Sequence, residues 1–227
     1  MVLRALLLTA AVLFAWSAIA QIAPSENEIA GYRGLHAAAA AGDTVAIERL
    51  VKAGSAIDPR DSHQRTPLHL AFHLKRAEAA RLLLQLGADP NALEAQQYDI
   101  VTIASVADDP AMLKIALDGG GKASNITSPY RGTALIAAAH LGHDEVVRML
   151  IAAKAPLDHV NNLHWTALIE SIVLGNGGKR HTATLAALVK AGANVNLADG
   201  NGATPLTLAR GHGYAEMAKI LEAAGAK

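Results

Sequence analysis

The chain has 227 residues with 20 basic and 20 acidic side chains, so its formal net charge is zero, and it contains no cysteine. The balanced charge argues against a dedicated nucleic-acid binder, and the lack of cysteine excludes disulfides, cysteine zinc ligands and thiol catalysis. Hydrophobic residues make up 52% of the chain but aromatic residues only 4%, so alanine and leucine supply most of the apolar content and favour helices.

Residues 1–20 have the pattern of a secretory signal peptide. Arg4 precedes an uncharged apolar run, and Ala18-Ile19-Ala20 offers a cleavage box of small residues before Gln21. We predict cleavage after Ala20, a periplasmic or secreted mature protein, and no stable membrane insertion after cleavage. The alternative is an uncleaved N-terminal anchor, because no charged residue lies between Arg4 and Glu26.

From residue 31 to residue 227 the sequence repeats with a period near 33 residues, after a lead-in at 21–30. A helix-start motif recurs at spacings of 33, 33, 34, 33 and 38 residues, at Arg33, Thr66, Asp99, Thr133, Thr166 and Thr204. A second landmark keeps step with it, at Gly54–Asp58, Gly87–Asn91, Gly121–Asn125, Lys154–Asp158 and Gly192–Asn196. This periodicity predicts six repeats that start near residues 31, 61, 94, 128, 161 and 199.

Each repeat is predicted to contain two helices and a protruding loop. Thr66 can cap a helix whose first turn suits Pro67, and Gly142 suits a left-handed helix end. The second helix carries apolar pairs one turn apart, such as Val146 and Val147 followed by Leu150 and Ile151, which predicts one buried stripe. The segments between repeats are polar and rich in turn-forming residues, as in a protruding hairpin.

These residues resemble the ankyrin repeat, whose signature includes a Thr-Pro-Leu-His helix start, a Gly-His break and a Gly-Ala-Asp-x-Asn helix end. Thr66–His69, Gly142-His143 and Gly87–Asn91 match these motifs, and the resemblance covers residues 31–227. It implies an all-α solenoid of about six helix–turn–helix units with β-hairpin-like loops. It also implies a non-catalytic protein that binds other proteins through the concave face of the solenoid.

Two patterns could indicate chemistry. His63, His69 and His73 lie close together, as zinc ligands can, but His69 occupies the signature position at which the imidazole ties neighbouring turns by hydrogen bonds. The glycine-rich segment 175–181 lacks the spacing of a phosphate-binding loop and coincides with the extra residues of the fifth repeat, so we predict a lengthened loop. No catalytic constellation occurs, and we predict neither an enzyme nor a cofactor or metal site.

The candidate partner-binding residues share positions within the repeat. Arg65, Tyr98 and Trp165 directly precede the helix-start motif, and Tyr130 lies in the hairpin of the fourth repeat. His73 and His140 share a position near the end of the first helix, and His212 is one residue further on. We predict that these seven residues build a concave face on which a monomeric protein binds an exported partner protein. The alternative is a periplasmic metal- or small-molecule-binding protein that uses His63, His73, His140 and the 175–181 segment.

Overall fold

The computed structural model describes residues 23–227, so the predicted signal peptide at 1–20 lies outside the described residues. Within 23–227 the chain forms thirteen helices and no strand, with one isolated bridge between Thr127 and Gly132. The helices are α1 (Glu26–Gly31), α2 (Gly34–Ala41), α3 (Thr44–Lys52), α4 (Pro67–His73), α5 (Ala77–Gln85), α6 (Ile100–Val106), α7 (Pro110–Asp118), α8 (Ala134–Leu141), α9 (Asp144–Ala152), α10 (Ala167–Val173), α11 (Lys179–Lys190), α12 (Pro205–Gly211) and α13 (Ala215–Ala223). The all-α class predicted from the sequence is confirmed.

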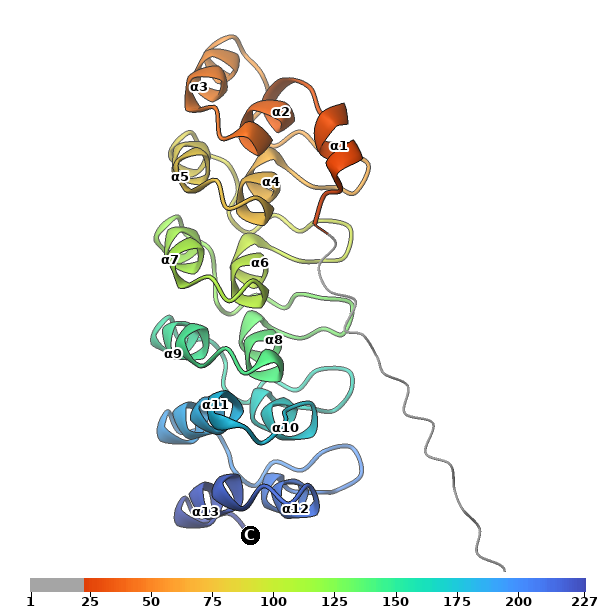
Figure 1. Ribbon diagram of the computed structural model, residues 1–227, viewed down its shortest axis with the longest axis vertical. Helices are drawn as coiled ribbons and strands as arrows, with labels where there is room; N and C mark the ends of the chain where they lie inside the picture. Colours follow the sequence, from red (N-terminus) through yellow and green to blue (C-terminus); the bar gives the residue numbers. More distant parts are fainter. Residues whose placement is uncertain (1–22) are drawn as a thin grey trace, which may run out of the picture.

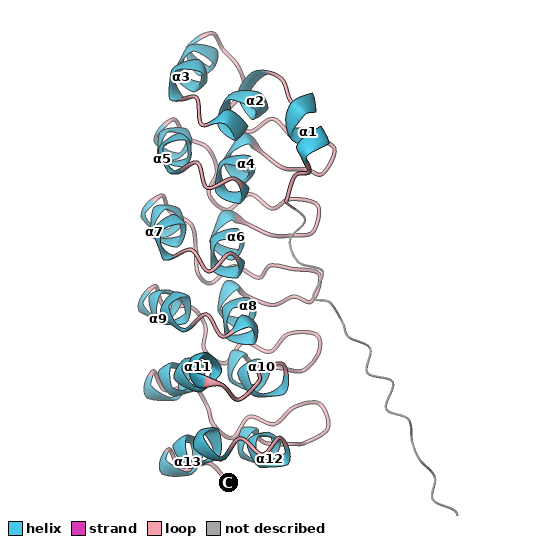
Figure 2. Cartoon of the chain, in the orientation of Figure 1, coloured by secondary structure: helices cyan, strands magenta, loops and turns pink. Residues whose placement is uncertain are grey.

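Six helix pairs stack into one elongated array (Figure 1). The first helices of the pairs, α2 to α12 by even numbers, form one row, and the second helices, α3 to α13 by odd numbers, form a parallel row. The loops that connect successive pairs project from the first-helix row on the side away from the second helices (Figure 2). Each pair therefore packs mainly against its two neighbours, as in a solenoid.

Side-chain caps explain where the first helices begin. Thr66, Thr133, Thr166 and Thr204 each accept a hydrogen bond from the backbone N–H three residues on, which satisfies a donor that the helix leaves free. The third repeat lacks this threonine, but the Asp99 carboxylate accepts the Thr102 N–H at 2.8 Å in its place. The predicted cap at Thr66 is confirmed, and Asp99 is an equivalent cap.

The core follows the repeat. One position of the second helices is fully buried in five successive pairs, at Leu83, Ala116, Leu150, Leu188 and Leu221. Burial of each large side chain there contributes about 2 kcal/mol, so the array is held by a continuous apolar stripe between the two helix rows.

Five hairpin loops present the other side of the array. Each is closed by a backbone hydrogen bond, between residues 61 and 65, 94 and 98, 127 and 132, 161 and 165, and 199 and 203. The first four are also joined to one another, because Ala95 N–H donates to the His63 carbonyl, Ser128 N–H to Gln97 and Asn162 N–H to Tyr130, at 2.9 to 3.0 Å. These bonds tie four hairpin loops into one rigid edge.

Three details add to or differ from the sequence-based predictions. The lead-in at 21–30 contains most of α1, which a Ser25–Glu28 capping box begins. The extra residues of the fifth repeat lengthen the helix as well as the loop, since α11 starts at Lys179 and has 12 residues against 9 in α9. In the third repeat the left-handed helix end is Gly120, with φ of 94°, one residue before the Gly121–Asn125 landmark begins. No helix within residues 23–227 combines the length and apolar character needed to cross a membrane.

Candidate functional site

The candidate site is the surface built by the hairpin loops and the adjoining ends of the first helices, which we call the concave face. Arg65 was expected on it, but the side chain is only 2% exposed, so the prediction of an accessible arginine is wrong. The Arg65 guanidinium donates from Nε to Asp61 at 2.8 Å and from Nη2 to the Glu28 carboxylate of α1. The short helix α1 therefore covers the first position of the predicted row.

The charges under α1 hold one another ionised. Hydrogen bonds from Ser25 and then from Arg65 lower the pKa of Glu28 to about 2. Burial alone would raise the pKa of Asp61, but hydrogen bonds from Tyr32 and Arg65 outweigh it and lower that pKa to about 2. This cluster combines one cation with two carboxylates, so it is an ion-pair network and leaves no isolated buried charge.

The next positions of the row differ in accessibility. Tyr98 is buried, with 8% of its surface exposed, so its predicted role as an open aromatic contact is wrong. In the fourth repeat Gly132 takes the equivalent position, because that hairpin loop is one residue longer and Tyr130 lies nearer its tip. Tyr130 and Trp165 are both partly buried, and these two aromatic side chains are the ones that the structure leaves on the concave face.

A row of exposed aliphatic side chains on the hairpin loops was missed by the sequence analysis. Leu93, Ile126 and Val160 hold the same repeat position in three consecutive loops, with exposed fractions of 38%, 46% and 45%. Arg60 and Ala198 hold this position at the two ends, so the row, which we call the aliphatic row, spans the three central loops. These positions align once the repeats are superposed on their closing hydrogen bonds, because the fourth loop is one residue longer than its neighbours.

A buried carboxylate supports the loop that carries Trp165. The side chain of Glu170 in α10 is only 6% exposed, and its Oε1 accepts a hydrogen bond from Asn161 Nδ2 at 2.8 Å. Asn161 Oδ1 in turn accepts the Trp165 N–H at 3.0 Å, and His140 Nδ1 lies 3.4 Å from Glu170 Oε2. His140 is therefore a member of an internal polar network that also faces the surface.

The other two predicted histidines lie apart. His73 is partly buried, and burial followed by the positive charges of His69 and Arg65 lowers its pKa to about 4, so its imidazole is neutral at pH 7. His212 is exposed at the far end of the array, where its ring stacks on Tyr214 at a centroid distance of 5.3 Å.

The signature histidines are structural, as the repeat position predicted. His69 Nδ1 accepts the Thr66 N–H at 3.1 Å, and its Nε2 lies 3.1 Å from the Ala92 carbonyl of the next loop. His63 pairs with Glu28 at 3.1 Å. Among residues 23–227 no three histidine or carboxylate side chains come together in a way that could hold a metal ion.

Arg180 and His181 of the 175–181 segment are engaged within the chain. Arg180 bonds to Asp108 at 2.8 Å and to Asp144 at 3.3 Å, so it connects the third, fourth and fifth repeats. His181 Nε2 lies 2.9 Å from the His140 carbonyl oxygen. The inserted segment thus connects the fifth repeat to the third and fourth repeats.

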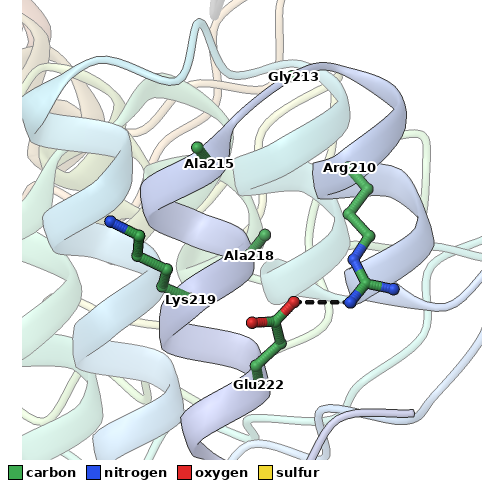
Figure 3. A pocket seen from close by; sticks show the side chains of 6 residues that line it. All are labelled: Arg210, Gly213, Ala215, Ala218, Lys219 and Glu222. Atoms are coloured by element: carbon green, nitrogen blue, oxygen red, sulfur yellow. Dashed lines mark hydrogen bonds and ion pairs between the residues drawn. The ribbon is translucent and has the colours of Figure 1, made fainter.

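A shallow depression of about 340 Å³ lies on the last repeat, between α12 and α13 (Figure 3). An ion pair of 2.7 Å between Arg210 and Glu222 crosses it. The five earlier repeats have uncharged residues at these positions, and all are apolar except Ser105 of the third repeat; Phe72 and Leu84 of the second repeat are examples. The end face of the array is therefore polar, and the depression lies apart from the concave face.

Comparison with known proteins identifies the family to which this architecture belongs. The family model described as ankyrin repeats (three copies) matches residues 9–94 and 101–199. The Escherichia coli (strain K12) protein YahD, named as an ankyrin repeat protein, is 32% identical over 190 residues, which cover 83% of this chain and 94% of that protein.

Two solved structures agree with these matches. An ankyrin repeat domain from Acinetobacter baumannii AYE superposes with a TM-score of 0.81 at 44% identity, covering 85% of this chain and 98% of that one. The ankyrin repeat domain of Bcl-3, a member of the IkappaB protein family, superposes with a TM-score of 0.78 at 29% identity, covering 87% and 88%.

The fold, the capped helix pairs and the hairpin loops define a solenoid of helical repeats. The chain belongs to the ankyrin repeat family. Ankyrin repeats are generally protein–protein interaction modules, and the family is typically a non-catalytic scaffold, so a protein partner is implied here.

Proposed function

We propose that this chain is an exported, monomeric, non-catalytic protein that binds a partner protein on its concave face. The observation that carries the proposal is the aliphatic row of Leu93, Ile126 and Val160 on hairpin loops that backbone hydrogen bonds tie together. A preformed surface loses little conformational freedom on binding, and apolar and aromatic side chains supply most of the binding energy of protein interfaces.

The neighbouring side chains of the concave face support the same proposal. Tyr130 and Trp165 add partly exposed aromatic surface next to the aliphatic row, and Glu170 and Asn161 fix the loop that carries Trp165. His73 and His140 add imidazoles at the ends of α4 and α8. The zero net charge of the chain offers no reason to propose nucleic acid as the partner.

The experiment is crosslinked capture of the partner from the native compartment by the full chain. We expect the double substitution Ile126→Ser and Val160→Ser to reduce capture at least tenfold while the thermal unfolding midpoint stays unchanged. Leu86→Ser is the control, because Leu86 is an exposed aliphatic residue, with an exposed fraction of 36%, at the end of α5 in the other helix row. Equal capture by the double variant and the wild type would contradict the proposed surface.

The proposed location has its own test. The apolar run and the Ala18-Ile19-Ala20 box support export with cleavage after Ala20. Cell fractionation should place the protein in the periplasm or the medium, and N-terminal sequencing should begin at Gln21. A protein that retains Met1 in the cytosolic fraction would contradict this assignment.

A further inference from the structure

A glutamate of the chain itself occupies one end of the concave face. Arg65 holds the repeat position that Tyr98 and Trp165 hold in later repeats, yet Glu28 of α1 contacts it; Figure 1 shows α1 beside the first helix pairs of the array. Resting on the proposed function, we infer that Arg65 and His63 form a carboxylate-binding site, which Glu28 fills in this structure and which takes an acidic side chain of the partner protein when α1 is displaced.

The two oxygens of the Glu28 carboxylate have different partners. Glu28 Oε1 receives the Arg65 Nη2 donor and lies 3.1 Å from His63 Nε2. Its other oxygen, Oε2, is turned back to its own helix, where it accepts the Ser25 N–H at 2.8 Å and the Ser25 hydroxyl at 2.7 Å. Only one oxygen of Glu28 therefore serves the site, whereas a carboxylate from another chain could offer both to the guanidinium and the imidazole.

α1 is attached to the repeats mainly by polar contacts. The helix has six residues and none of them is buried, so it contributes little to the apolar core. Besides Glu28, its anchors are the flanking residues Pro24, which is buried, and Tyr32, whose hydroxyl donates to Asp61 at 2.7 Å. A segment held by polar contacts at the surface opens at a lower free energy than the packed repeats.

Displacement of α1 would remove Glu28 from Arg65 and His63. Without Glu28, Arg65 would keep only its bond to Asp61, and His63, which is half exposed, would face solvent beside it. A guanidinium with free N–H donors in a largely enclosed position favours a new carboxylate strongly. The aliphatic row begins on the next hairpin loop with Leu93, so the fitting partner segment has an acidic residue followed by apolar side chains.

The test uses the full chain and a probe taken from it. The double variant Glu28→Ala and Tyr32→Phe removes both polar contacts of α1, and Glu26→Ala is the matched control, because Glu26 lies on the same helix without an ion pair. The probe is a labelled peptide of residues 23–34, used alongside the same peptide with Glu28→Gln. Hydrogen exchange of residues 26–31 is measured in parallel.

We expect at least tenfold faster exchange of α1 in the double variant. We also expect the probe to bind this variant with a Kd of about 1 mM or tighter and at least tenfold more tightly than it binds the wild type or Glu26→Ala. The Gln peptide should lose this binding, and adding His63→Ala to the double variant should weaken it several-fold.

Several results would overturn the inference: unchanged protection of α1 in the double variant, equal binding of the Glu and Gln peptides, or equal binding to all proteins. Partner capture separates this inference from the proposed function. Capture that depends on the aliphatic row but is unaffected by the double variant would reject the carboxylate site alone, whereas probe binding without any partner capture would reject the proposed function alone.

Discussion

The same substitution is expected to have opposite effects at two buried threonines. Thr184 of α11 is fully buried and its hydroxyl has no hydrogen-bond partner among residues 23–227, whereas Thr166 is equally enclosed but caps α10 through the Ile169 N–H. Valine keeps almost the same shape, so neither change opens a cavity, and threonine and valine have similar helix propensities.

The magnitudes follow from the hydrogen bonds. Thr184→Val removes an unsatisfied buried hydroxyl, which should stabilise the fold by about 1 kcal/mol. Thr166→Val removes a helix cap and leaves the Ile169 N–H without a partner, which should destabilise it by about 1 kcal/mol. The two variants should therefore differ by about 2 kcal/mol in the free energy of unfolding.

Urea denaturation followed by circular dichroism measures the free energy of unfolding of each variant. The comparison requires that this free energy depends on urea concentration with the same slope in both variants. Destabilisation by Thr184→Val of the same size as by Thr166→Val would refute the reasoning, because it would show that the Thr184 hydroxyl makes a contact of value in the folded protein.

Three further outcomes are expected. Lys154 has a φ of 61° at a helix end where other repeats have glycine, so Lys154→Gly should stabilise the fold by roughly 0.5–1 kcal/mol in thermal denaturation, and destabilisation would contradict this. The pKa values of Glu28 and Asp61 are lowered to about 2, so their contribution to docking of α1 is complete above their ordinary values of 4.5 and 3.8 and is lost as the pH falls towards 2. Hydrogen exchange of α1 should accelerate over that range before the repeats unfold, and simultaneous exchange of both would contradict the separate docking of α1. Trp165→Ala should leave the unfolding midpoint within a few degrees of the wild type but weaken partner binding by about 1–3 kcal/mol, measured by titration, and a destabilised variant with full affinity would oppose its role in binding.

The sequence predicts those features of the fold that depend on the repeated residues. The helix pairs, the cap at Thr66 and the bridging imidazole of His69 depend on residues close in the chain or exactly one repeat apart, so the pattern contains them. The burial of Arg65 depends instead on α1, a segment outside the repeat. A Ser-x-x-Glu capping box at Ser25 and Glu28 was visible, but a six-residue helix with no apolar stripe gives no periodic signal.

The candidate site was predicted only in part for a similar reason. The repeat position of Trp165 and Tyr98 was recognised, but the burial of Tyr98 depends on three-dimensional packing that the repeat position does not determine, and in the longer fourth loop Gly132 holds this position. The aliphatic row was missed because single exposed aliphatic residues are common on protein surfaces. Its meaning comes from the alignment of three loops side by side, which only the structure shows.

The ion pair between Arg210 and Glu222 has a consequence for self-assembly. Stacking of one repeat on the next joins two different surfaces, so an array whose last face matched its inner faces could add a further copy head to tail, and each addition would present the same face again. Such growth does not close and leads to filaments. Two charged side chains at positions that are uncharged in the five earlier repeats make this addition unfavourable, because stacking would bury them away from water. An exposed ion pair adds little to the stability of a single molecule, so its main effect at this position is to disfavour stacking of another apolar helix pair on this face.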